Sequence, residues 1–307
     1  RTIGARCSPS VWPNTVPEQL MRSKSVLIII CGLVLSLVAT PLLGAQTPTP
    51  EAAPATLPAA AWLAPDTPTE GELSPEVAMV LYAFTGEAEQ TISLAVTSDA
   101  ETLDPLVILT KPDGTLVGWD DDSGEGLNAQ LSVTLPSTGT YLALVSSIYA
   151  LYLPSDAEAV SGAYTVSLTG TSAPSPEADF PTLDALGIPL ITPEEPLALS
   201  LDTTTPLRWV GLRVQDSIIL DVNATSENTD PLLYVFDETG QRIGLDDDSA
   251  ETAQDAFIPA LPLNNSGTYL MMVAAFDYHR ALLRGITPGD AQLTIERVEL
   301  ETDEAGK

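Results

Sequence analysis

The chain has 307 residues and a formal net charge of −30, from 42 acidic and 12 basic residues, with a single histidine and two cysteines. Because phosphate binding needs clustered lysine and arginine, this balance excludes nucleic acid as a partner and disfavours anionic membrane surfaces. The histidine and cysteine counts also exclude a zinc site of the usual type. The acidity fits a soluble secreted protein, a high-salt environment or a binder of divalent cations.

The start of the chain predicts export. Residues 1–20 begin with Arg and are interpreted as upstream translation or a mis-called start. Met21–Lys24 is positive, Val26–Val38 is apolar and Leu43–Ala45 offers a small-residue cleavage site, so residues 21–45 have the layout of a signal peptide. The apolar run is shorter than the roughly 20 residues of a spanning helix, with an uncleaved anchor as the alternative. We expect a protein that is secreted or tethered to the cell surface, in the extracellular space or periplasm.

The chain that follows is acidic and has no cysteine. Cys7 and Cys31 both precede the expected cleavage site, so the mature chain from Gln46 has no disulfide. It keeps 8 basic and 41 acidic residues, a net charge of −33. Residues 46–71 are rich in Pro, Thr and Ala, a composition that does not bury a core, and they predict an extended linker.

A block of about 45 residues then occurs twice, from Asp104 to Val145 and from Asp230 to Val273. Each copy contains Asp-Pro-Leu, a glycine turn, Asp-Asp-Asp-Ser, Leu-Pro and Gly-Thr-Tyr-Leu in the same order. The offset between the copies is 126 residues up to Leu-Pro and 128 at Gly-Thr-Tyr. A repeat of this length with one small insertion predicts two copies of one domain.

The predicted domains are acidic and of ordinary size. They occupy residues 72–170 and 199–300, with a Pro-rich linker at 171–198 and a tail at 301–307. Residues 72–170 carry a net charge of −13 and residues 199–298 one of −9, so the acidity belongs to the domains. About 100 residues suffice for an independent core.

The periodicity within each copy is that of strands. Thr91–Val96 and Ser217–Val222 alternate apolar and polar residues, as half-buried strands do. Leu106–Leu109 and Leu232–Phe236 each lead into a turn sequence, as the first strand of a hairpin does. No stretch of 12 residues has helical periodicity. The sequence predicts an all-β fold of two tandem antiparallel β-sandwiches joined by Pro-rich linkers.

An ordered set of short motifs runs through the first copy. The motifs are Tyr82-x-Phe84-x-Gly86, Asp104-Pro105, Pro112-Asp113-Gly114, Asp120-Asp121-Asp122-Ser123-Gly124, Leu135-Pro136, Gly139-Thr140-Tyr141 and Gly162-Ala163-Tyr164-Thr165-Val166. Together they resemble the bacterial pre-peptidase C-terminal domain. The second copy departs from this set, with Ala250 in place of Gly124 and Trp209-Val210-Gly211 in place of the opening aromatics.

The resemblance implies a jelly-roll-like sandwich of the kind that follows secreted proteases and occurs in bacterial collagenases. Such modules bind substrate or are trimmed off, and they usually accompany a catalytic domain. The sequence shows no catalytic domain, so the resemblance bears on fold more than on function.

The triple aspartates are the candidates for a metal site. In an extended segment the first and third aspartates of each triplet share a face, where they repel unless they are solvated or share a cation. Ca²⁺ takes roughly 6 to 8 oxygen ligands, and an aspartate from a neighbouring turn could add one. The predicted ligands of a structural Ca²⁺ are Asp104, Asp120, Asp122, Asp230, Asp246 and Asp248. The alternative is a solvated loop whose Asp and Ser side chains cap their own turn.

Catalytic chemistry finds little support in the sequence. His279 is the only histidine and has no counterpart in the first copy, so a Ser-His-Asp hydrolase would rest on one residue. Asp122-Ser123-Gly124 and Asp248-Ser249-Ala250 resemble the paired motifs of aspartic proteases, but further aspartates precede them in place of an apolar strand. Nothing singles out a carboxylate pair for glycoside cleavage. We expect that the protein is not an enzyme.

Recognition is the favoured role. After the Gly-Thr-Tyr strand each copy has a loop with aromatic residues, Tyr149 and Tyr152 in the first and Phe276 and Tyr278 in the second. Such side chains can bind sugars or protein ligands, or they can cover the open end of the sandwich. The sequence predicts a noncatalytic module that binds an extracellular protein or polysaccharide. The alternatives are an accessory or inhibitory subunit of a separately encoded secreted hydrolase, and a hydrolase.

Overall fold

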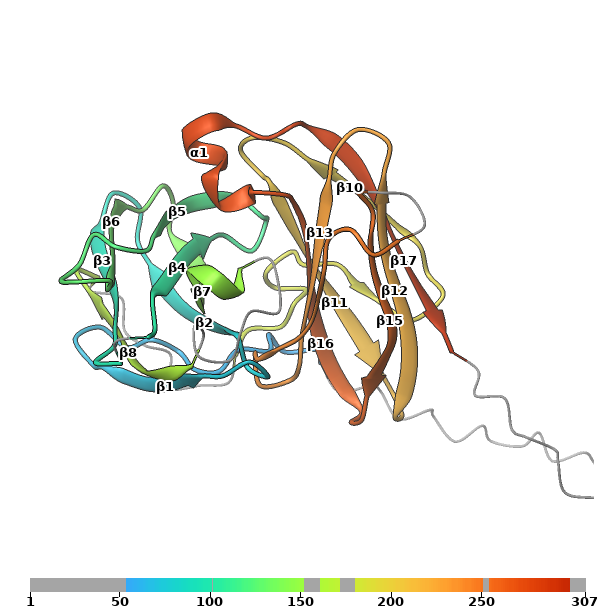
Figure 1. Ribbon diagram of the computed structural model, residues 1–307, viewed down its shortest axis with the longest axis horizontal. Coiled ribbons are helices and arrows are strands. Elements are labelled where there is room, and N and C mark those ends of the chain that lie inside the picture. Colours follow the sequence, from blue (N-terminus) through green and yellow to red (C-terminus); the bar gives the residue numbers. More distant parts are fainter. Residues whose placement is uncertain (1–53, 101, 152–160, 172–179, 251–253, 299–307) are drawn as a thin grey trace, which may run out of the picture. The chain divides into compact units, whose positions relative to one another are not determined.

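The computed structural model describes residues 54–100, 102–151, 161–171, 180–250 and 254–298 (Figure 1). Residues 52–307 form one compact unit. The expected signal peptide lies outside the described residues. Within them, no helix has the length and apolar composition needed to span a membrane.

Strands dominate the described part of the chain, which confirms the all-β prediction (Figure 1). The helical segments among the described residues are the one-turn helix α1 (Ala281–Arg284) and two 3₁₀ turns, Ile148–Ala150 and Tyr278–Arg280. All three lie in the connections that follow the two Gly-Thr-Tyr strands.

The first eight strands form an antiparallel sandwich of two sheets. They are β1 (Thr69–Leu73), β2 (Met79–Gly86), β3 (Thr91–Thr97), β4 (Pro105–Thr110), β5 (Leu116–Asp120), β6 (Ala129–Thr134), β7 (Gly139–Ser147) and β8 (Gly162–Thr169). One sheet has the strand order β1-β8-β3-β6 and the other has β2-β7-β4-β5. This is the strand order of a jelly roll.

The remaining strands form a second sandwich. They are β9 (Leu190–Ile191), β10 (Leu197–Leu201), β11 (Leu207–Val214), β12 (Ile218–Ser226), β13 (Pro231–Phe236), β14 (Arg242–Asp246), β15 (Ala256–Leu263), β16 (Gly267–Ala275) and β17 (Gly289–Arg297). The sheet orders are β10-β17-β12-β15 and β14-β13-β16-β11-β9.

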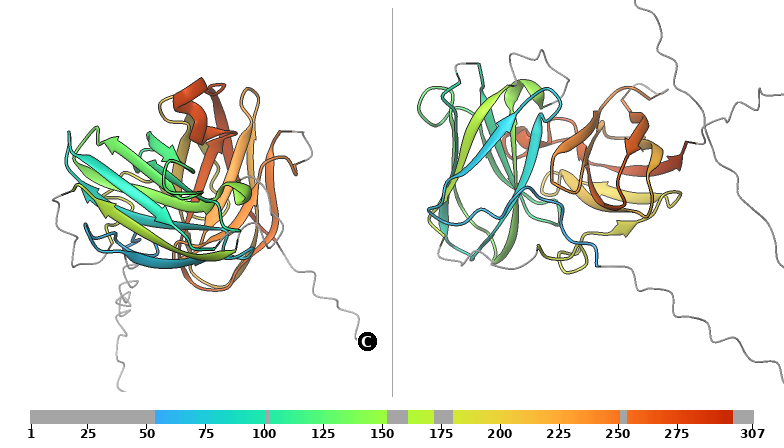
Figure 2. Two further views of the ribbon diagram at one scale, coloured as in Figure 1. Left: turned by 60° about the vertical axis from the view of Figure 1, so that its left-hand side comes forward. Right: turned by 90° about the horizontal axis from the view of Figure 1, so that it is seen from below.

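The two sandwiches therefore have one topology. Strands β10 to β17 repeat the order of β1 to β8 in both sheets, and β9 is a short parallel addition beside β11. The predicted pair of antiparallel, jelly-roll-like sandwiches is confirmed, and Figure 2 shows both groups of strands from two further sides.

The burial patterns divide the sheets into two kinds. Strands β3, β8, β12 and β17 alternate buried and more exposed residues, as the period-two patterns predict. Strands β4 and β13 are buried at every position, and β7 and β16 at nearly every position. A continuous apolar run is typical of a strand that is covered on both faces.

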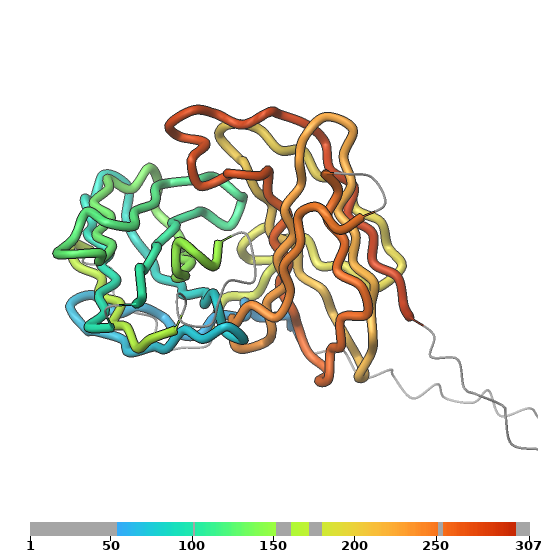
Figure 3. Tube along the Cα trace, in the orientation of Figure 1, coloured from blue at the N-terminus to red at the C-terminus, as the bar shows by residue number. Residues whose placement is uncertain are grey.

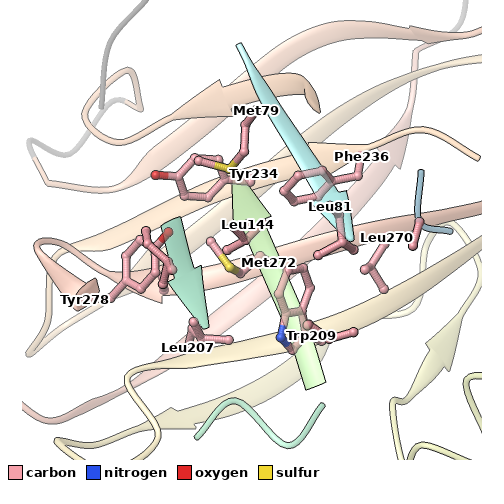
Figure 4. Close-up of a cluster of buried hydrophobic side chains, with 14 of the residues drawn as sticks. Met79, Leu81, Leu144, Leu207, Trp209, Tyr234, Phe236, Leu270, Met272 and Tyr278 are labelled. Carbon is pink, nitrogen blue, oxygen red and sulfur yellow. The ribbon is translucent and has the colours of Figure 1, made fainter. Parts of the chain in front are cut away.

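Both faces of these inner strands pack because the chain has a third core. Along β4, Val107 and Leu109 pack inside the first sandwich, whereas Leu106 and Ile108 pack in a core shared with the second. Figure 4 shows this shared core, in which Leu144 lies among side chains of the second sandwich such as Trp209. We call it the shared core. It joins the β2-β7-β4-β5 sheet to the sheet that contains β11, β13, β14 and β16.

Residues 54–65 are packed, which corrects the expectation of an extended linker for this part of 46–71; residues 46–53 lie outside the described residues. Ala55, Leu57, Ala59 and Leu63 are all buried, and Ala60 and Leu63 donate backbone hydrogen bonds to β2. Ala55, Leu57 and Ala59 pack in the shared core and Leu63 packs in the core of the first sandwich. The segment also bonds to the open edge of β2, which composition alone does not reveal.

The lead-in segments of the two copies also pair with each other. Thr56 and Thr182 form an antiparallel bridge. Leu57 donates to the carbonyl of Pro181, and Leu183 donates to the carbonyl of Ala55, each at 2.8–2.9 Å. Because equivalent residues exchange equivalent bonds, the pairing is reciprocal, as in a two-fold symmetric dimer.

The equivalence of the copies begins earlier than the predicted boundaries at 72 and 199. Asp66 and Glu194 both have positive φ, 58° and 76°. Each donates its N–H to the last strand of its own sandwich, to Leu168 and Ile295 respectively, at 2.8 Å. Part of the Pro-rich linker 171–198 packs against the sandwiches, since Leu183, Ile188 and Ile191 are buried.

Candidate functional site

The first aspartate of each triplet caps its own loop. Strand β5 ends at Asp120, whose Oδ2 accepts hydrogen bonds from the N–H groups of Ser123 at 3.1 Å and Gln130 at 2.6 Å. Asp246 Oδ2 does the same in the second copy, accepting from Ser249 at 2.9 Å and Phe257 at 2.7 Å. These two aspartates hold each loop against the next strand of its sandwich.

The other aspartates of each triplet lie near the preceding Asp-Pro aspartate. Burial raises the pKa of Asp104, and the negative charges of Asp121 and Asp122 raise it further. The strand ends at Asp120 and the chain turns, so the alternation of an extended segment stops there.

In the second copy the equivalent aspartate, Asp230, also has a raised pKa. Burial, followed by the charges of Asp248, Asp247 and Asp255, raises the pKa of Asp230 to about 6. Its Oδ1 is enclosed and accepts no hydrogen bond from the described residues. An enclosed carboxylate oxygen without a donor makes the ionised form of Asp230 costly.

The predicted metal ligands are brought together only in part, because the Asp-Pro aspartate of each copy lies near the third aspartate of its triplet while the first is used in capping. In the part of the chain that the structure describes, no group of three or more His, Cys, Asp or Glu side chains has a geometry that could hold a metal ion. Asp120 and Asp246 are used in capping, while Asp104 and Asp230 lie near the remaining aspartates of their triplets. Calcium binding at the triplets stays a prediction.

The aromatic residues that were predicted to bind a ligand differ in their exposure to solvent. Tyr149 is 56% exposed and Phe276 is 38% exposed. Tyr152 lies outside the described residues. Tyr278 is fully buried, so its predicted role in ligand binding is wrong. Its ring packs in the shared core beside Tyr234, because the loop that carries it passes between the sandwiches.

The loop after β7 is held by the second sandwich. Tyr234 donates its hydroxyl to the carbonyl of Leu151 at 2.6 Å, and Arg242 donates to the carbonyl of Ala150 at 2.7 Å. The Arg242 guanidinium also lies 5.9 Å from the centre of the Tyr234 ring. Burial lowers the pKa of Arg242. No motif in the sequence marks Arg242 for this contact.

The loop after β16 makes the reciprocal contact with β5 of the first sandwich, and the trace in Figure 3 shows it in red. The His279 ring lies edge-on to Trp119, with centroids 5.0 Å apart, and the Arg280 guanidinium lies 5.9 Å from the Trp119 ring centre. His279 is fully buried. Burial and the neighbouring Arg280 lower the pKa of His279 to about 4. Both loops that the sequence nominated for recognition thus join the two copies.

A groove of about 860 Å³ lies in the second sandwich, and we call it the second groove. It is lined by β10, β12 and β17 and by the connections at 227–230, 254–255, 275–277 and 284–287. Asp230 and Phe276, which the sequence assigned to different sites, both line it.

The lining of the second groove is acidic. Five lining residues are acids and one, Arg284, is basic, and Arg284 is ion-paired with Asp277. The acids are Glu227, Asp230, Asp255, Asp277 and Asp290. Asp255 Oδ1 accepts from the N–H of Ser226 at 2.8 Å. Sequence patterns missed Asp255 and Asp290 because they stand at strand ends without a motif. One signal was available in the sequence: when the two copies are aligned, Asp255 falls close to the polar residue Asn128.

Comparison with known proteins places one segment in a family. Residues 80–147 match the model of the bacterial pre-peptidase C-terminal domain, which confirms the resemblance for the first copy. No curated protein matches the chain. Among solved structures, the chain is similar to the pre-peptidase C-terminal domain of collagenase from Bacillus anthracis, at 12% identity and a TM-score of 0.28, over 36% of this chain and 94% of that one. It is also similar to a protein from Eubacterium rectale, at 12% identity and a TM-score of 0.21, over 76% and 74% of the two chains.

Proposed function

We propose that the protein is a noncatalytic extracellular binding module that holds a basic segment of another protein in the second groove. The family match supports the noncatalytic part, since the pre-peptidase C-terminal domain is a noncatalytic domain found in secreted proteases. The groove supports the binding part, because concave surfaces with a few convergent polar groups are the usual ligand sites.

The observation that carries the proposal is the state of Asp230. Asp230 lines the groove and stands among acidic neighbours, and its Oδ1 accepts no hydrogen bond from the described residues. A lysine or arginine side chain in the groove would offset the repulsion among these carboxylates. The half-exposed ring of Phe276 offers apolar surface to the stem of such a side chain. A partner with an anionic surface would add to the repulsion instead.

The test uses residues 52–307, which form one compact unit, and a hexapeptide with one lysine and otherwise neutral residues. The matched probe carries norleucine in place of lysine. Binding is measured by NMR titration at low salt. We expect the lysine peptide to bind at least about tenfold more tightly than its analogue, because the charge pair supplies the difference.

Asp230→Asn should remove that preference, and Asp216→Asn, an equal charge change at an exposed turn outside the groove, should retain it. Equal binding of both peptides, or binding of neither, would overturn the proposal. Binding to neutral glycans with loss in Asp230→Asn would reassign the groove to the polysaccharide alternative.

The family match favours a second candidate, an accessory or inhibitory subunit of a separately encoded secreted hydrolase. Secreted proteases of the source organism would be assayed with and without the purified protein. A change in the rate of one protease, together with its co-purification, would support this role. Unchanged rates for every protease tested would remove it.

A further inference from the structure

A second hollow lies at the matching place in the first sandwich. It has a volume of about 650 Å³ and is lined by β1, the end of β3 and β8, and we call it the first groove. The second groove is lined by β10, the end of β12 and β17. These are the equivalent strands in the shared strand order.

The strand registers show that the correspondence is residue by residue. In the first sandwich Thr165 pairs with both Glu70 and Thr97. In the second sandwich Gln292 pairs with both Ala198 and Thr225. All six residues line their respective grooves. The two grooves therefore cross the same three strands at the same level.

The rim of each groove is built by the same hydrogen bonds. Ser98 Oγ donates to the carbonyl of Ala163, and Ser226 Oγ donates to the carbonyl of Asp290, both at 2.7 Å. The N–H of Ser98 bonds Asn128 Oδ1, and that of Ser226 bonds Asp255 Oδ1, both at 2.8 Å. The loop after β3 and the loop after β12 are thus fixed in the same way.

The two grooves also share chemistry. The residue after the rim serine is acidic in both, Asp99 in the first groove and Glu227 in the second, and both are exposed. The first groove has two further acids, Glu70 and Glu72, and no basic residue among the described residues that line it. An acidic hollow with hydroxyl groups on its rim therefore occurs twice in one chain.

We infer that the first groove is a second binding site for the same ligand class, so that the chain is bivalent for basic protein segments. This inference rests on the proposed function. Neutral Asn128 and Ala163 stand where the second groove has Asp255 and Asp290, and the first groove is also the smaller one. The first site is therefore the weaker of the two.

Bivalence changes what the protein can hold. The shared core joins the two sandwiches, so both grooves belong to one compact unit. A partner with two basic segments at the matching separation would bind the second segment intramolecularly, which increases overall affinity without any new contact. A partner with a single segment would gain nothing from the first groove.

The test measures stoichiometry with residues 52–307 and the lysine hexapeptide, by NMR titration of the described groove residues. We expect chemical-shift changes in two sets of residues, one for each groove. The residues of the first groove should saturate at the higher peptide concentration. Glu70→Gln with Asp99→Asn should abolish shifts in the first groove alone. Asp230→Asn with Glu227→Gln should abolish them in the second alone. Glu125→Gln, an exposed acid outside both grooves, should retain both sets.

The outcomes separate the two proposals. If the titration shows a single site, and that site is lost in the second-groove variant, the proposed function stands and bivalence is overturned. Shifts in neither groove overturn the proposed function itself, and bivalence with it. Shifts spread over the acidic surface, equal in all variants, would show nonspecific charge attraction and would also overturn both. Two sites that respond separately to their variants would support the inference.

Discussion

At the scale of single residues, Asp120 has the clearest structural role, since one carboxylate oxygen accepts two backbone hydrogen bonds. We expect Asp120→Ala to lower the free energy of unfolding by about 1–3 kcal/mol, because two N–H groups lose a charged acceptor. Urea unfolding measures this. Asp121→Ala is the control, and it should leave stability unchanged or raised because it removes a charge that raises the pKa of Asp104.

The calcium prediction has a test of its own, which compares the parent chain with Asp104→Asn. Thermal unfolding of the parent chain is recorded with millimolar Ca²⁺ and then with chelator. Saturation at about 100 times the dissociation constant would add roughly 2.7 kcal/mol, a shift of several degrees. Such a shift, specific to Ca²⁺ and absent from Asp104→Asn, would confirm the prediction. Superimposable curves would contradict it and leave loop capping as the role of the triplets.

Asp230 should make the protein less stable toward neutral pH. Its folded pKa of about 6 exceeds the ordinary value of 3.8, so the folded state binds the proton more tightly. The stabilisation that the folded protein gains from holding this proton is fully present below pH 3.8 and is lost as the pH rises through 6. We expect Asp230→Asn to be more stable than the parent at pH 7 and to show a smaller loss between pH 4 and 6. Equal pH profiles for the two proteins would contradict this.

His279 should act in the opposite direction. Its folded pKa of about 4 lies below the ordinary 6.5, so the unfolded state binds more protons in this window. Its contribution is complete above pH 6.5 and is lost as the pH falls through 4. The rings of Trp119 and Tyr278 lie edge-on to His279, and the charge of Arg280 adds to the effect of burial on its pKa.

We expect His279→Phe, which keeps an aromatic ring against Trp119, to lose less stability than the parent when the pH is lowered from 6.5 to 4. Thermal unfolding at several pH values measures it. If both proteins lose stability equally as the pH falls, residues other than His279 take up the protons that drive acid unfolding.

At the scale of elements, the hairpin turns carry contacts between the sandwiches. Gly114 has φ of 88°, and a Cβ there would overlap the carbonyl oxygen of Leu207. Gly126 has φ of 73° with open space around it. We expect Gly126→Ala to cost about 1 kcal/mol from backbone strain alone. Gly114→Ala should cost clearly more, because the turn must also withdraw from the second sandwich. Similar losses in both variants, measured by urea unfolding, would contradict a contact role for the turn.

The elements also show where sequence reasoning succeeds and where it stops. Period-two alternation identified the half-buried strands because one face of each meets water, as in β3. The runs Leu106–Leu109 and Leu232–Phe236 were identified as strands, but a continuous apolar run does not state what covers its second face. The shared core was therefore missed, and with it the burial of Tyr278. Residues 54–65 were missed because their packing depends on edges and cores formed by distant strands.

At the scale of the whole molecule, the shared core should make unfolding cooperative across both sandwiches. Separation would expose Leu144, Trp209, Met272 and their neighbours to water at once. We expect one calorimetric transition for residues 52–307, with equal calorimetric and van't Hoff enthalpies. Leu144→Ala should lower that single transition, by about 2–5 kcal/mol in unfolding free energy. Two resolved transitions in the parent would show that the sandwiches unfold independently.

The reciprocal bridge between Thr56 and Thr182 bears on how the two copies stay associated when the protein is diluted. Equivalent residues meet there as they would between two identical molecules, yet one covalent chain supplies both. A dimer of separate copies would dissociate when its concentration falls below its dissociation constant. In the duplicated chain the second copy is always present at the high effective concentration set by the connecting segment. The pair of grooves thus stays assembled however far the protein is diluted.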